Sequence, residues 1–214
     1  MKNPRSSHRR ALALCAAVGL LAALAGCNVM PPAQEDATRY FVLSDNTAAA
    51  QAQMAQGGLR IGLHPVALEN YLDHKVMVMR TGANEVRFED YRRWAEPLDV
   101  GVARILKSTL LSSPDVAQVF VEPFPVDQER DFDVTVKVVR CEGAAAPDGG
   151  HVASLEATFE VAAQGAAPHV VYRKVFAAPE EAWDGSDYGR LAALLSKEVG
   201  ALGRAVLAGI PPKS

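Results

Sequence analysis

Histidines and a short run of acidic residues are the side chains in this sequence whose types could support metal binding or hydrolysis. His64, His74, His151 and His169 are far apart in the sequence, and none has a cysteine or second histidine at the close spacing typical of metal sites. Each also lies beside a predicted turn or strand end. We therefore expect histidines that are exposed or make single hydrogen bonds, and no metal or cofactor site.

Groups for nucleophilic or acid–base catalysis are equally sparse. Glu180, Glu181 and Asp184 could form a carboxylate cluster, and with His169 they could serve a hydrolase, but a solvated loop accounts for them more simply. The sequence has no Gly-x-Ser-x-Gly motif, and the glycines at 57–58 are not followed by the Gly-Lys-Ser/Thr run of a phosphate-binding loop. We therefore predict no catalytic residues and no enzyme, with a membrane-tethered hydrolase as an alternative.

Cys27 is the cysteine with a clear chemical context. The first ten residues carry four basic and no acidic side chains, and residues 11–23 form an apolar run that is too short to span a bilayer comfortably. The Leu-Ala-Gly-Cys sequence at 24–27 resembles the lipobox of bacterial lipoproteins. This resemblance implies a signal peptide at residues 1–26, cleavage before Cys27, and acylation of Cys27 by fatty acids such as palmitate.

The acyl chains would attach the protein to a membrane. Asn28 stands where an Asp typically keeps such lipoproteins in the inner membrane, so this sorting rule implies the periplasmic face of the outer membrane. Loss of the signal leaves 18 of the 22 basic residues against 25 acidic ones, a net charge of −7. Nucleic acid is excluded as a partner, because phosphate binding needs a basic surface.

Cys141 is the only thiol left after Cys15 is removed with the signal and Cys27 is acylated. No disulfide can then form within the chain. Because Cys141 follows an apolar strand, we expect a packed, unreactive thiol rather than a reactive one.

The mature chain is predicted to be a tether followed by one domain. Residues 27–38 contain two prolines and several polar side chains but almost nothing to bury, which is typical of a tether. Residues 39–210 are long enough for one sizeable hydrophobic core and short for two. We therefore predict a single domain over 39–210.

Hydrophobic periodicity predicts the elements of this domain. Leu98 begins a 3.6-residue pattern that ends near residue 110, and Tyr188 begins a second one that ends near residue 206, with an N-cap supplied by residues 184–187. Alternating patterns predict strands at residues 39–43, 59–63, 76–80, 85–88, 116–121, 132–138, 155–161 and 170–176. The predicted fold class is α+β, a mainly antiparallel sheet with two amphipathic helices packed on one face.

The densest group of large and charged side chains lies just before the first predicted helix. Arg and Trp are enriched at interface hot spots, so Arg93, Trp94, Glu96 and Pro97 are candidates for an interaction or assembly surface. The alternative is structural: Trp94 packs under the helix, and Arg93 pairs with Glu96 to hold the turn.

Several segments resemble a known family. Tyr-Phe-Val-Leu at 40–43, Ile-Gly-Leu-His-Pro-Val at 61–66, Tyr-Leu-Asp at 71–73 and above all Arg-Trp-Ala-Glu-Pro-Leu at 93–98 are similar to the ABC-type transport auxiliary lipoproteins of the PqiC/YmbA type. The similarity covers nearly the whole mature chain. One departure is Glu69-Asn70 before the Tyr-Leu-Asp turn, where the family commonly has a proline.

The resemblance implies a non-enzymatic outer-membrane subunit of a system that moves lipid between the two membranes. Its partner would be a PqiB-like periplasmic or inner-membrane protein with mammalian-cell-entry (MCE) domains, whose conduit the lipoprotein docks or anchors, supporting envelope integrity. The cyclic symmetry of such assemblies is compatible with a homo-oligomeric ring. A lipid carrier that encloses its cargo between sheet and helices is the alternative.

Overall fold

The computed structural model describes residues 35–44 and 57–212. Its internal contacts divide the chain into two units, Met1–Ala37 and Thr38–Ser214. Of the first unit only residues 35–37 are described, so Cys27, the predicted signal and most of the predicted tether lie outside the described residues. The described strands of the second unit are β1 (Arg39–Phe41), β2 (Leu59–Leu63), β3 (Ala67–Leu68), β4 (Val76–Gly82), β5 (Glu85–Trp94), β6 (Val116–Val121), β7 (Phe132–Ala145), β8 (His151–Ala163), β9 (His169–Ala177) and β10 (Glu181–Trp183).

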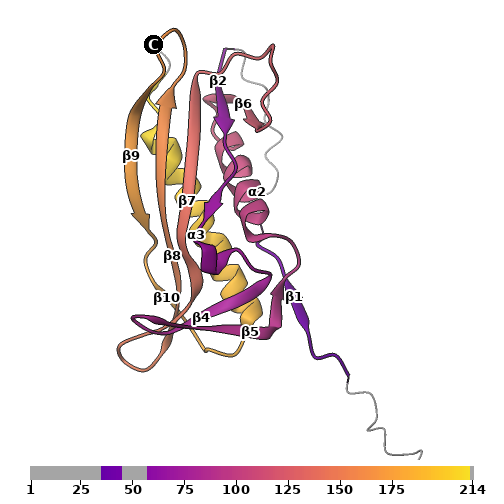
Figure 1. The fold of residues 1–214 in the computed structure, drawn as a ribbon. Coiled ribbons are helices and arrows are strands. Elements are labelled where there is room, and N and C mark those ends of the chain that lie inside the picture. The colour runs from indigo at the N-terminus through magenta and orange to yellow at the C-terminus, as the bar shows by residue number, and fades with distance from the viewer. Residues whose placement is uncertain (1–34, 45–56, 213–214) are drawn as a thin grey trace, which may run out of the picture. The chain divides into compact units, whose positions relative to one another are not determined.

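Strand β7 organises the sheet (Figure 1). One of its edges pairs antiparallel with β8, which in turn pairs antiparallel with β9 and, near its own start, with β10. The alternating apolar residues of β7 and β8, such as Val134, Val136, Ala157 and Phe159, are buried. These three long antiparallel strands contain the strands predicted at residues 132–138, 155–161 and 170–176.

The other edge of β7 is shared by three strands that follow one another along it. β2, β3 and β4 pair with the start, middle and end of β7, and all three run parallel to it. β2 also pairs parallel with β6. β4 forms an antiparallel hairpin with β5, and the far edge of β5 carries the short parallel strand β1.

The α+β class is confirmed, but the prediction of a mainly antiparallel sheet is wrong, because five of the nine strand pairs are parallel. The physical reason lies between β2 and β4. The chain does not reverse there, but advances along one edge of β7 through Pro65 and a 3₁₀ turn at Asn70–Leu72. Alternation shows which face of a strand is buried, and it is the same for parallel and antiparallel neighbours.

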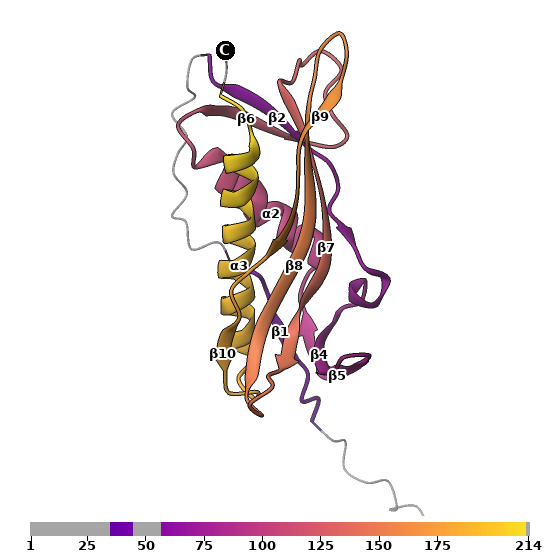
Figure 2. The same ribbon diagram turned by 90° about the vertical axis from the view of Figure 1, so that its left-hand side faces the viewer.

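Two helices, α2 (Leu98–Leu111) and α3 (Tyr188–Gly209), cover one face of the sheet, as predicted (Figure 2). The predicted N-cap of α3 is Asp187, whose carboxylate accepts two backbone N–H groups of the first turn at 3.0 and 3.2 Å. The helices cross closely at Gly203, where a Cβ atom would lie 2.8 Å from the Cβ of Thr109. This close approach joins both apolar faces to the sheet in one core.

The long axis of β7 separates two ends of the domain. The last residues of β7 pair with β4, so β4, β5 and β1 form one end, called here the β1–β5 end. The first residues of β7 pair with β2, so β2, β6 and the neighbouring loops form the β2–β6 end. The fourteen residues of β7 span roughly 40 Å between them.

Candidate docking surface

Trp94 ends β5 and is a core residue. It is 4% exposed and belongs to the main cluster of buried apolar side chains. Its backbone N–H donates a hydrogen bond to the Lys75 carbonyl oxygen at 2.7 Å. Three residues later Pro97 caps the start of α2, so Trp94 fixes the turn between strand and helix. The structure therefore agrees with the structural alternative for Trp94, in which its side chain packs inside the domain rather than facing a partner.

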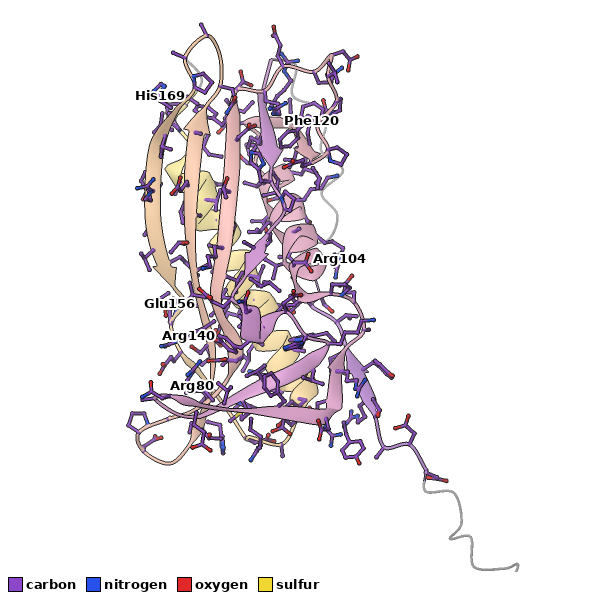
Figure 3. The ribbon with its side chains drawn as sticks, viewed as in Figure 1. Arg80, Arg104, Phe120, Arg140, Glu156 and His169 are labelled. Atoms are coloured by element: carbon purple, nitrogen blue, oxygen red, sulfur yellow. The ribbon has the colours of Figure 1, made fainter. Side chains whose placement is uncertain are left out.

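Glu96 and Arg104 fasten the segment that follows β1. The Glu96 carboxylate accepts a short hydrogen bond from the Arg104 guanidinium, which also donates to the Leu43 carbonyl oxygen at 2.8 Å. The Ala95 N–H donates to the Phe41 carbonyl oxygen at 2.8 Å. Figure 3 shows Arg104 on α2 facing this part of the chain. We call Trp94, Glu96 and Arg104 the β1 clamp.

Arg93 makes a different contact from the one considered in the sequence. It does not bond to Glu96, and its Nε instead donates to the Asp90 carbonyl oxygen at 3.1 Å. Both Arg93 and Pro97 are exposed. Of the four candidate interaction residues, these two are therefore accessible to a partner, whereas Trp94 and Glu96 act within the clamp.

Helix α3 holds the same segment from another direction. The Ser44 N–H donates to the Ser196 hydroxyl at 2.9 Å, and the rings of Phe41 and Tyr188 lie 6.4 Å apart. The Arg92 guanidinium lies over the Tyr188 ring. Burial, and next the negative charge of Glu89, raise the pKa of Tyr188 to about 12. Residues 41–44 are thus bound to both helices, and a force applied at β1 is transmitted to the core.

Four large side chains lie exposed on β1, on β5 and directly after β1. The exposed fractions are 64% for Tyr40, 47% for Val42, 41% for Phe88 and 59% for Tyr91. Tyr40 pairs with Arg93 in the parallel β1–β5 ladder, so both side chains leave the same face, and Tyr40 and Val42 together line a cleft of about 380 Å³ beside α3. A cleft of about 350 Å³ continues this face, lined by His74, Lys75, Val76, Phe88 and Arg93. We call Tyr40, Val42, Phe88, Tyr91, Arg93 and Lys75 the aromatic-basic face.

The sequence analysis did not identify this face. It assigned residues 40–43 and 85–88 to strands because they contain aromatic and branched side chains, and such side chains are usually buried. The signal that could have found it is that Tyr40 and Val42 alternate with Phe41, so only one of the two sets can face the core.

The β2–β6 end carries two clefts. One, of about 520 Å³, lies between Asp115, Leu59 and the end of α3, where Leu207 and Ile210 contribute to it. The other, of about 890 Å³, is formed by the loop at 126–131 and the turn at 163–165. Its charged lining residues are Arg60, Asp127, Glu129, Arg130 and Asp131.

The residues of the hydrolase alternative do not come together. His169 pairs with Ala163 of β8, whereas Glu181 pairs with Ala153 of the same strand. Ten residues of extended strand place these positions roughly 33 Å apart. Figure 3 shows His169 at the far end of the sheet from β10. Glu181 instead pairs with Lys197 of α3 at 2.6 Å.

His64 is the histidine with the most polar partners. Its Nδ1 lies 2.7 Å from a carboxylate oxygen of Glu122, its Nε2 lies 3.6 Å from Asp133, and its ring meets Phe124 edge-on. Arg130 pairs with the same Asp133 at 2.7 Å. Within residues 35–44 and 57–212 no group of three or more His, Cys, Asp or Glu side chains could hold a metal ion.

Two buried carboxylates were missed by the sequence analysis. Glu142 bonds to the Arg80 guanidinium at 2.5 Å, and Tyr71, whose pKa is raised to about 12 by burial and then by the charge of Glu142, completes the group. Glu198 on α3 is 2% exposed, and its oxygens have no hydrogen-bond partner among the described residues. Burial, and next the charge of Glu181, raise the pKa of Glu198 to about 7.

Glu198 left a recognisable signal, because it follows Leu194 by four positions and Leu195 by three and so lies on the apolar stripe of α3. Cys141 is also buried, as predicted, and its burial raises the pKa of the thiol far above its ordinary value. The low thiolate fraction makes this cysteine unreactive.

Comparison with known proteins gives the family. The sequence model of the ABC-type transport auxiliary lipoprotein component matches residues 41–206, which run from β1 to the last turn of α3. The chain belongs to this family. Membership confirms the resemblance found in the sequence and implies a lipid-anchored, non-catalytic component of an ABC-type transport system. A comparison with curated proteins found no match.

Solved structures share the fold of this auxiliary lipoprotein. An uncharacterized protein aligns with a TM-score of 0.63 at 18% identity, over 81% of this chain and 99% of its own. A DUF330 protein from Xanthomonas campestris aligns with a TM-score of 0.65 at 14% identity, over 79% and 93%. A PelC dodecamer from Paraburkholderia phytofirmans is more distant, with a TM-score of 0.43 at 18% identity over 73% and 89%.

Among the described residues, no helix combines the length and apolar character needed to cross a bilayer.

Proposed function

We propose that this auxiliary lipoprotein is the outer-membrane docking subunit of an intermembrane lipid transport system, which holds the periplasmic conduit of an MCE-domain partner. The observation that carries the proposal is the family match over residues 41–206. The acyl chains of Cys27 anchor the protein, and Asn28 assigns it to the periplasmic face of the outer membrane. The protein makes a mechanical connection and catalyses no reaction.

The β1 clamp supports this role. A docking subunit has to transmit load between its anchor and its partner, and the anchor enters the domain at β1. Three residues of this strand cannot resist load by themselves. Hydrogen bonds donated by Ala95 and Arg104, and one accepted by the Ser196 hydroxyl, fix residues 41–44 to the β5–α2 turn and to both helices. The backbone from Phe41 to Ser44 is therefore fixed to the core.

The filled interior favours docking over the alternative of a lipid carrier. The space between sheet and helices is occupied by large side chains that are less than 2% exposed, among them Phe159, Ile105, Leu155 and Leu195. Close-packed cores leave few voids larger than a water molecule. A carrier would have to displace these side chains, and native mass spectrometry of the purified protein should accordingly show no bound phospholipid.

A pull-down from mild-detergent membrane extract tests the docking role. The tagged full-length protein should recover an MCE-domain protein. The size of the lipoprotein's complexes in the same extract would show whether identical subunits form a ring. Recovery of the bait alone from an extract with an intact MCE complex would refute stable docking. Arg93→Ala at the β1–β5 end and Val126→Ser, at a fully exposed loop position of the β2–β6 end, show which end makes the contact.

Two cysteine substitutions test the role of the lipid anchor separately from the stability of the fold. Cys27→Ser should abolish acylation and remove the protein from the outer-membrane fraction, and it should fail to complement an envelope-stress phenotype. Cys141→Ser is the matched control, because it alters a buried, unreactive thiol and leaves the lipobox intact. Full complementation by Cys27→Ser would refute the anchoring role.

A further inference from the structure

We propose that the aromatic-basic face is a membrane-contact surface, which lies against the phospholipid headgroups of the membrane that holds the acyl chains of Cys27. This inference rests on the lipid anchor of the proposed function. It adds a second, non-covalent attachment that orients the domain, with the β1–β5 end on the membrane and the β2–β6 end away from it.

The side chains of this face suit a lipid interface. Single exposed apolar residues are common on protein surfaces, but Tyr40, Val42, Phe88 and Tyr91 are 41–64% exposed and gather at the β1–β5 end, where Arg93 pairs with Tyr40 and shares a cleft with Phe88. Tyrosine is enriched at the headgroup level of membranes because its ring is apolar and its hydroxyl stays hydrated. Val42 and Phe88 add apolar surface that can enter the boundary between headgroups and acyl chains.

The charge of the face complements phosphate groups. Arg93 lies beside Tyr40, and Lys75 lines the same cleft as Phe88. These two basic residues contrast with the overall charge of the protein, because the chain without its signal carries a net charge of −7. Asp73 and Asp90 are also exposed nearby and offset part of the attraction. Each basic group near an anionic bilayer contributes about 1 kcal/mol, so the rings supply most of the binding.

Chain length places the face within reach of the membrane. Tyr40 is the thirteenth residue after Cys27, and a segment of that length spans at most about 45 Å and on average about 20 Å when flexible. The β1–β5 ladder keeps Tyr40 in register with Arg93, and the β1 clamp fixes the carbonyl of Leu43 just after Val42, so the membrane-proximal strand cannot turn independently of the domain. Tethering at this distance raises the effective concentration of lipid, so weak contacts suffice.

Nitroxide labels on the full-length acylated protein test the contact. The protein is reconstituted in vesicles of phosphatidylethanolamine with phosphatidylglycerol, and one label is placed at Val42→Cys and a control label at Val175→Cys, which is 64% exposed on β9. Cys141 is buried and does not react. We expect collisions with a water-soluble nickel complex to be severalfold rarer at position 42 than at position 175. Equal accessibility at both positions would overturn the proposal.

Two serine pairs show whether the rings are responsible. Tyr40→Ser with Tyr91→Ser should restore water access at position 42 severalfold, whereas Val170→Ser with Val171→Ser on β9 should leave it unchanged. Protein that does not float with the vesicles would overturn the anchor, whereas floating protein with a water-exposed label at 42 would overturn the membrane contact alone. Protection at 42 that requires native envelope proteins would assign the face to a protein partner and also overturn it.

Discussion

The two ends of the domain use their surface side chains in opposite ways. At the β1–β5 end, short backbone hydrogen bonds and the β1 clamp fix a three-residue strand, and aromatic rings remain exposed beside basic groups. At the β2–β6 end, loops carry clefts lined by Asp127, Glu129 and Asp131, and Val126 is fully exposed. The first end is built to resist displacement, whereas the second offers varied shapes for recognition. Separate sets of substitutions should therefore affect stability and partner binding.

The largest effect is expected at Trp94. Trp94→Ala removes a large buried side chain at the turn between β5 and α2, and truncation of a buried aromatic residue costs about 3–5 kcal/mol of unfolding free energy. Urea unfolding followed by circular dichroism measures this loss. Trp94→Phe is the control and should lose less. If Trp94→Ala lowered the unfolding free energy by no more than a substitution at an exposed site does, Trp94 would not stabilise this end.

A pH-dependent effect is expected at Glu198, on the helix that joins the two ends. Its pKa is about 7 in the folded state against 4.5 when unfolded, so the folded state binds more protons in this window. Stability is therefore full below about pH 4.5 and is lost as the pH rises to about 7, by about 3 kcal/mol. Glu198→Gln should remove this slope, whereas Glu180→Gln, an exposed neighbour, should retain it.

The same experiment tests whether the ends are one folding unit. α3 runs from the β1–β5 end, where Tyr188 meets Phe41, to the cleft at Ile210. If ionisation of Glu198 weakens α3, probes at both ends should report the same unfolding midpoint at every pH. Different midpoints would divide the domain into two cooperative units.

The sequence predicted local structure well because apolar periodicity reports burial. The helices at Leu98 and Tyr188 and the strands of β7 and β8 follow directly from their patterns. The order of strands in the sheet cannot be derived from these patterns, because β2, β3 and β4 pair with residues of β7 that are more than 60 positions away in sequence. Residue type could not decide between an interface and a structural role for Trp94, because only the fold shows that this side chain is 4% exposed and belongs to the core.

A smaller and local effect is expected at Arg104. Arg104→Gln loses the charged hydrogen bonds to Glu96 and to the Leu43 carbonyl oxygen, and because both side chains are partly exposed this costs only about 1 kcal/mol. Hydrogen exchange should speed up about fivefold at residue 95, whose N–H bonds to Phe41, and stay unchanged in β8. Lys107→Gln, on the same helix, is the control. Equal changes in both regions would refute a local clamp.

The smallest effect on stability is expected at the β2–β6 end. Asp127→Asn with Glu129→Gln changes an exposed loop, where Glu129 forms only a 3.5 Å surface pair with Arg60, so the unfolding free energy should shift by less than about 0.5 kcal/mol. Recovery of the partner in the pull-down should nevertheless become less dependent on salt, because charged rims mainly set encounter rates. Unchanged salt dependence would mean that this loop is not the recognition surface, and the partner would then have to meet the lipoprotein along the sheet between its two ends.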